Sequence, residues 1–147
     1  MPRLIFLVPC RKAIIDKDDN ILSIHEVIDG LTVNIPKRQE LPSDAVTPTE
    51  WTVLTNWLRQ PGDEGRQFEQ RVIVNHPDGE VFIDSLSDFR MDTRTHRMRL
   101  NIRGFPIGQS GELDIRVFIR AALGNEEWME CGGYPIMVNH IQHEANA

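Results

Sequence analysis

The stretch Arg97-Met98-Arg99-Leu100-Asn101-Ile102-Arg103 alternates polar and apolar side chains without a break. A second stretch, Glu112-Leu113-Asp114-Ile115-Arg116-Val117, repeats the alternation one loop later. Successive side chains of a β-strand point to opposite faces, so a period of two residues predicts strands with one buried face. No window of the sequence shows the three- and four-residue spacing of apolar residues, with capping residues at its ends, that is typical of a helix. The two stretches therefore predict an all-β chain.

Short apolar runs separated by turn residues continue this pattern on both sides. Residues Leu4–Cys10 are apolar on both faces, as in a strand that is covered on both sides. A turn at 16–20 and a break at Asp29-Gly30 predict a hairpin whose second arm bends near the glycine. Three prolines in residues 36–50 predict a long loop, and Pro77-Asp78-Gly79 predicts a tight turn.

These elements add up to about eight or nine strands, which need two packed sheets or a closed barrel. Long loops and strands of unequal length favour a sandwich. We expect residues 1–147 to form a single antiparallel β-sandwich domain, immunoglobulin-like or jelly-roll-like, with a polar tail from about residue 140. The length and the apolar content of 40% suit one hydrophobic core.

Charge and hydropathy exclude some classes of function. The net charge of −6 disfavours binding to nucleic acid, and no apolar run is long enough to insert into a membrane. The first ten residues lack the features of an export signal, which predicts a cytoplasmic protein. Two cysteines, Cys10 and Cys131, lie far apart in sequence, and they are either reduced thiols or a bridge between neighbouring strands.

Arginines form the densest cationic stretch, and three of them share the outward face of one predicted strand: Arg97, Arg99 and Arg103. This face is either a groove for an anionic partner or a solvated face paired with nearby acids. A hairpin that is symmetric about Ile107 would place Arg103 opposite Glu112, and Asn101 opposite Asp114. No aromatic residues interleave with the arginines, which argues against a nucleic-acid groove.

Two tryptophans are candidate interaction residues. Trp51 and Trp57 lie six positions apart, so they share one face of a predicted strand, while Leu54 and Leu58 share the other. If the tryptophan face is exposed, it is a protein contact surface or a platform for stacking a sugar. If both faces are covered, the tryptophans belong to the core.

Asp16, Asp18 and Asn20 occupy the first, third and fifth positions of a calcium-loop pattern. Ile21 and Val27 replace the glycine and the glutamate that the pattern requires, so a helix–loop–helix calcium site is excluded. A looser calcium site would share these residues with other loop acids: Asp63, Glu64 or Asp78. The alternative is a turn whose acidic side chains bind nearby backbone amides. We therefore expect no cofactor and no resident metal.

The pattern of residues 22–33, LSIHEVIDGLTV, with Gly104-Phe105-Pro106, Gly111 and the strand Leu113–Val117, resembles a family of uncharacterised bacterial proteins. Each member of that family is a short β-sandwich domain of unknown function. The resemblance covers about half the chain and implies the fold, and it carries no catalytic residues over to this sequence.

Catalytic motifs such as a nucleophile elbow or a paired histidine metal motif are absent, which predicts a protein that is not an enzyme. The leading hypothesis is an interaction or structural module that binds a protein partner or itself as a homo-oligomer. The second is a sandwich that binds a small ligand or a carbohydrate with the help of calcium. An enzyme with a dispersed site ranks third.

Overall fold

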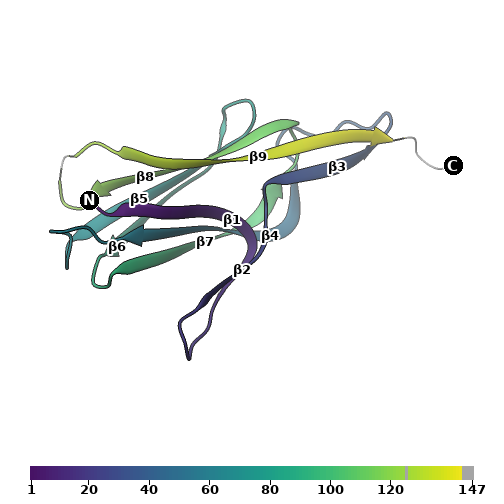
Figure 1. Ribbon diagram of the computed structural model, residues 1–147. Helices are drawn as coiled ribbons and strands as arrows, with labels where there is room; N and C mark the ends of the chain where they lie inside the picture. Colours follow the sequence, from purple (N-terminus) through teal and green to yellow (C-terminus); the bar gives the residue numbers. More distant parts are fainter. Residues whose placement is uncertain (125, 144–147) are drawn as a thin grey trace.

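A computed structural model describes residues 1–124 and 126–143, and these residues contain no helix. They form nine strands in two sheets (Figure 1), so the all-β prediction is confirmed. The strands are β1 (Arg3–Ile15), β2 (Leu22–Val27), β3 (Gly30–Pro36), β4 (Val46–Leu58), β5 (Gln67–Asn75), β6 (Val81–Arg90), β7 (Thr95–Pro106), β8 (Gly111–Ala121) and β9 (Met129–His143).

Sheet A has the strand order β2-β1-β4-β7, and sheet B has the order β3-β9-β8-β5-β6. All neighbours are antiparallel except β3 and β9, which run parallel, so the prediction of a purely antiparallel fold is wrong at this pair. The cause lies at the bend predicted near Gly30. The chain leaves sheet A after Val27 and enters sheet B at Gly30, where β3 starts beside β9.

The predicted hairpin about Ile107 is also wrong, because β7 belongs to sheet A and β8 to sheet B. The segment that links β7 to β8 does not form a hairpin turn but is hydrogen-bonded to the loop before β4. The amides of Ile107 and Gly108 donate to the Ala45 carbonyl at 2.9 and 3.2 Å. A Cβ atom at Gly108 would lie 2.2 Å from the Pro42 carbonyl oxygen. Only glycine therefore permits this crossing between the sheets.

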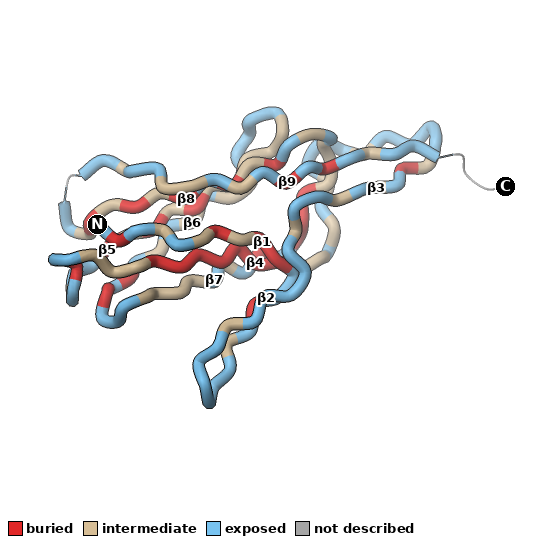
Figure 2. The backbone as a smooth tube through the Cα atoms, in the orientation of Figure 1, coloured by how far each residue is buried: buried red, intermediate tan, exposed pale blue. Residues whose placement is uncertain are grey.

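The inward faces of both sheets share one hydrophobic core (Figure 2). The alternation predicted for β8 is confirmed, since the four apolar residues at alternate positions are fully buried there: Leu113, Ile115, Val117 and Ile119. Sheet A contributes Trp51, Val53 and Trp57 from β4. Each such side chain stabilises the fold by about 1.5–3 kcal/mol relative to exposure.

A second, smaller core lies on the outer face of sheet A. It contains Cys10, Ala13 and Leu54, with Leu22 of β2 packed against them. The end of β1 and the strand β2 form a hairpin that folds beneath this face (Figure 1). β4 is therefore covered on both sides, which explains the unbroken run of seven buried residues from Trp51 to Trp57.

β3 and β9 extend together beyond the rest of the two sheets (Figure 1). Residues 140–143 belong to β9, so the predicted polar tail does not begin at 140. His140 Nε2 lies 2.6 Å from the Ile107 carbonyl oxygen, which anchors this part of the strand. Residues 144–147 lie outside the described residues. The described chain also has no helix able to cross a membrane.

Candidate functional site

Trp51 and Trp57, the candidate contact residues, are buried, with exposures of 1% and 0%. Trp51 Nε1 donates to the Gly104 carbonyl at 3.0 Å, and Trp57 Nε1 donates to Gln70 Oε1 at 2.8 Å. Of the two alternatives, the core position is confirmed and the exposed contact or sugar-stacking surface is wrong, because the strand that carries them is covered on both faces. They share one face, as the spacing predicted, and that face is the core.

The arginines on β7 hold the hairpin and the neighbouring strand. Arg97 donates to the Asn20 carbonyl at 2.8 Å, and Arg99 donates to the Ala13 carbonyl at 3.4 Å. Arg103 pairs with Glu50 of β4 at 3.4 Å, and not with Glu112. The predicted partners in β8 are excluded because they lie on the other sheet.

A self-paired charged surface does exist, on the outer face of sheet B. Arg71 pairs with Asp84 at 2.6 Å, and Arg120 pairs with Glu69 at 2.7 Å. The Arg120 guanidinium lies 4.1 Å from the centre of the Trp128 ring. Trp128 therefore covers the outside of sheet B under the side chains of Arg71 and Arg120.

The acidic turn at the tip of the hairpin satisfies its own backbone. Asp16 Oδ1 accepts hydrogen bonds from the Asp18 and Asp19 amides at 2.8 and 3.3 Å, which lowers the pKa of Asp16. Asn20 has a positive φ of 59°, as turns require. Among the residues that the structure describes, no three His, Cys, Asp or Glu side chains are grouped as metal ligands.

The other acids named for a looser calcium site have separate partners. The buried Asp63 accepts from the Gln60 amide at 2.9 Å and pairs with the amino group of Met1 at 3.1 Å. Asp78 accepts from the Gln109 side chain at 3.1 Å. Glu64 lies 3.7 Å from Arg59. These contacts keep the carboxylates apart from the turn at residues 16–20.

Both cysteines are free thiols, Cys10 buried on sheet A and Cys131 half-buried on β9 of sheet B. Burial raises the pKa of each thiol, and the Glu130 carboxylate adds to this effect at Cys131. A raised pKa keeps a thiol protonated and unreactive.

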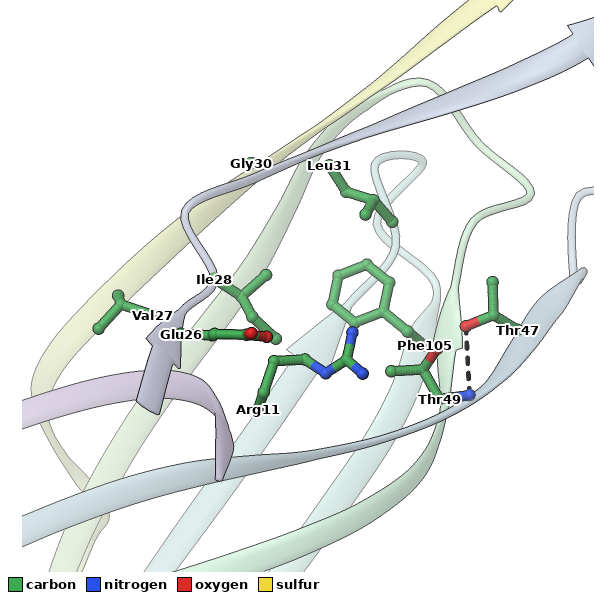
Figure 3. A pocket seen from close by; sticks show the side chains of 9 residues that line it. All are labelled: Arg11, Glu26, Val27, Ile28, Gly30, Leu31, Thr47, Thr49 and Phe105. Carbon is green, nitrogen blue, oxygen red and sulfur yellow. Dashed lines mark hydrogen bonds between the residues drawn. The ribbon is translucent and has the colours of Figure 1, made fainter. Parts of the chain in front are cut away.

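One hollow of the surface lies where the chain crosses from sheet A to sheet B (Figure 3). It has a volume of about 230 Å³. Its floor is apolar and is formed by Ile28, Leu31 and the buried Phe105. Its polar lining residues are Arg11, Glu26, Thr47 and Thr49.

Two local irregularities create this hollow. Glu26 has a positive φ of 55°, which ends β2 and turns the chain toward sheet B. On the opposite side, the pairing of β4 with β7 shifts register between Thr47 and Glu50 around Pro48. The Thr49 amide there donates to Thr47 Oγ1 at 3.4 Å, as drawn in Figure 3. The two bends leave space between strands that would otherwise lie side by side.

Arg11 is the central side chain of this region. Its guanidinium reaches between Phe105 and Thr49 (Figure 3), and it has no ion-pair or hydrogen-bond partner within the described part of the chain. Two larger hollows of about 660 and 580 Å³ share Arg11 with the first and are lined in addition by Lys12. We call the three hollows together the Arg11 groove.

Sequence reasoning missed this groove. The Arg11-Lys12 pair directly after an apolar strand was its one visible signal, since it puts two cations beside a core strand. Comparison with known proteins adds no assignment, because no protein-family model matches the chain and no curated protein matches its sequence.

Proposed function

We propose that the two packed sheets form one immunoglobulin-like β-sandwich. The order β1-β4-β7 corresponds to strands A, B and E of that fold, and β9-β8-β5-β6 corresponds to G, F, C and C′. The hairpin formed by the end of β1 and β2 is then an insertion near the first strand. The conserved disulfide of antibody domains has no counterpart in the two free cysteines. We also propose that the chain belongs to the family of uncharacterised bacterial β-sandwich proteins that its sequence resembles.

We further propose that the domain is a non-enzymatic module that binds a protein partner in the Arg11 groove. The observation that carries this proposal is the unpaired Arg11 guanidinium above an apolar floor. A guanidinium binds carboxylates with two parallel hydrogen bonds, and the adjacent Thr47 and Thr49 add polar atoms. The C-terminal residue of a protein can carry both groups that suit this hollow, an apolar side chain for the floor and a carboxylate for Arg11, on one Cα atom.

The size of the groove supports a peptide segment. Pockets for drug-sized ligands span about 300–1,000 Å³, so the hollow of about 230 Å³ over Phe105 suits a single aliphatic side chain. The two larger hollows, both lined by Lys12 and one of them also by His25, have room for the preceding residues of the segment. Glu26, which also lines the hollow, offers an acceptor for a backbone N–H of the same segment.

The test uses N-acetyl-leucine, the smallest probe with both features, in an NMR titration of ¹⁵N-labelled protein. We expect saturable shifts of the amides at Arg11, Thr49 and Phe105, and weaker binding of the neutral N-acetyl-leucinamide. Arg11→Gln should abolish the preference for the acid, whereas the exposed Arg94→Gln on the turn before β7 should not. Equal binding of acid and amide, or shifts confined to other residues, would refute the proposal.

A further inference from the structure

The two sheets end in open edge strands on the same side of the molecule. β7 is the last strand of sheet A and β6 is the last strand of sheet B. Residues 91–94 join the two strands, and the rings of Phe89 and His96 stack with centroids 5.2 Å apart. The two edges therefore lie one above the other. Within the described chain, neither strand has a second neighbour, so each presents unpaired backbone groups.

This arrangement is suited to two-fold symmetry. Consider a two-fold axis that runs parallel to the strands along this side, midway between the two sheets. Rotation about it brings sheet B of a second copy into line with sheet A of the first, and sheet A of the second into line with sheet B of the first. It places β7 of one copy beside β6 of a second copy, and β6 of the first beside β7 of the second. Because consecutive strands joined by a short link run in opposite directions, both new pairs are antiparallel. Each sheet A then continues into the partner's sheet B, and both open edges are closed.

The axis also fixes the register, because rotation about it does not move residues along the strands. The Phe89–His96 contact gives the level of the two strands. Counting back from Phe89 along β6 and forward from His96 along β7 puts Asp88 level with Arg97, and Leu86 level with Arg99. Asp88 is exposed and has no ion-pair partner among the described residues, and Leu86 is 57% exposed.

Charge favours the crossed pairing over the two alternatives. The outer face of β6 carries Asp84, Asp88 and Arg90, and Arg90 is paired with Asp92 of the link at 2.8 Å, whereas the outer face of β7 carries arginines at 97, 99 and 103. Pairing β6 with a second β6 gathers aspartates, and pairing β7 with a second β7 gathers arginines. Like charges across a strand pair are destabilising, while opposite charges stabilise it. The two edges of one copy are thus complementary to each other and not to themselves.

We propose that two copies of this chain form a homodimer through crossed pairing of β6 with β7. The pairs that decide this interface, Asp88 with Arg97 and Leu86 with Arg99, include no residue that lines the Arg11 groove, although Asn101, Ile102 and Arg103 of β7 also line one of its larger hollows. The charge-reversal test at Asp88 and Arg97 therefore leaves the groove intact, and either proposal can fail without the other. Such a dimer covers Leu86 and gives Asp88 an arginine partner. It also continues the shared core, because Ile83 and Ile102 lie level on the inward faces.

Sedimentation velocity over a range of concentrations tests the assembly. We expect a monomer–dimer equilibrium that Asp88→Arg shifts toward monomer, with a rise of about tenfold or more in the dissociation constant. Adding Arg97→Asp to that variant should restore the dimer by reversing the pair. Asp44→Arg makes the same charge change on the exposed 42–45 loop and should leave the equilibrium unchanged.

A crosslink tests the register. With Cys10 and Cys131 replaced by serine, Asp88→Cys combined with Arg97→Cys should give a disulfide-linked dimer. The two positions lie on opposite outer faces within one copy, too far apart for an internal bond. A protein that stays monomeric at all concentrations would refute the proposal. So would a dimer that Asp88→Arg does not weaken, or one that fails to crosslink.

Discussion

At the scale of single residues, Gln70 is the polar contact between the two sheets. It lies on β5 of sheet B, and its Oε1 accepts from Thr55 Oγ1 at 2.6 Å and from Trp57 Nε1 at 2.8 Å, both on β4 of sheet A. All three residues are buried. Because water is excluded, neither donor has an alternative partner if the acceptor is removed, and buried donors without partners are costly.

We predict that Gln70→Leu lowers the free energy of unfolding by about 3 kcal/mol, since two buried donors lose their acceptor. The measurement is urea denaturation followed by tryptophan fluorescence. Gln67→Leu, an exposed glutamine on the same strand, should change the stability by less than about 0.5 kcal/mol. Equal effects of the two substitutions would show that the contact contributes nothing.

His96 gives the fold a dependence on pH. Burial lowers the pKa of His96, and the Asp92 carboxylate opposes this shift only partly. The unfolded chain, with an ordinary pKa of about 6.5, then binds the proton more readily than the folded one. Stability is therefore complete above that pH and decreases as the pH falls below it.

We predict that the free energy of unfolding decreases between pH 7.5 and 5.5, and that His96→Gln removes part of this decrease. Urea denaturation at both pH values measures it. His25→Gln, at an exposed histidine of β2, serves as the control and should leave the pH dependence as it is. A pH dependence that is identical in the wild type and His96→Gln would contradict the assignment.

At the scale of elements, the sequence predicted where strands begin and turn better than it predicted which strands meet. Alternation in β7 and β8 gave their buried faces correctly, because side-chain direction is a local property. It could not give their partners, since a crossing loop and a hairpin loop both contain Gly and Pro. The bend at Gly30 was likewise visible, but the parallel pairing with β9 depends on a strand over a hundred residues later.

The same limit applies to the candidate site. Trp51 and Trp57 were placed on one face correctly, but the cover over the other face comes from Leu22 and Ala13 of the hairpin. Nothing local to β4 indicates that cover. The Arg11 groove was missed for the same reason, because its lining residues come from segments far apart in the sequence.

The hairpin itself is a separable element whose packing can be tested through Cys10. That thiol is fully buried in the small core beneath the hairpin, next to Leu22. In a Cys131→Ser background, we predict that Leu22→Ala raises the rate of Cys10 labelling by a thiol reagent about tenfold, because the hairpin opens more often. Ile21→Ala, at a residue of the hairpin tip that is 60% exposed, should not change the rate. Labelling that requires global unfolding in every variant would contradict this prediction.

At the scale of the whole molecule, the two sheets depend on one core. Residues of β4 and of β8 belong to the same cluster, so neither sheet retains a buried face when the other is lost. A chain of this kind is expected to unfold in one cooperative step. The tryptophans report on this directly, because Trp51 and Trp57 lie in the core on sheet A.

We therefore predict that a cavity in sheet B destabilises sheet A as much as sheet B. Ile115→Ala, at a fully buried residue of β8, should lower the free energy of unfolding by about 3 kcal/mol through lost burial and the cavity left behind. In a Trp128→Phe background, fluorescence from the two core tryptophans and far-ultraviolet circular dichroism should shift together to the same lower urea midpoint. Leu123→Ala, at a residue that is 97% exposed, should leave both curves in place. The contrary outcome is a fluorescence curve that keeps its midpoint while circular dichroism loses part of its signal at lower urea. Sheet A would then be stable alone, and the two sheets would be separate folding units, because a shared core cannot lose one half and keep the other.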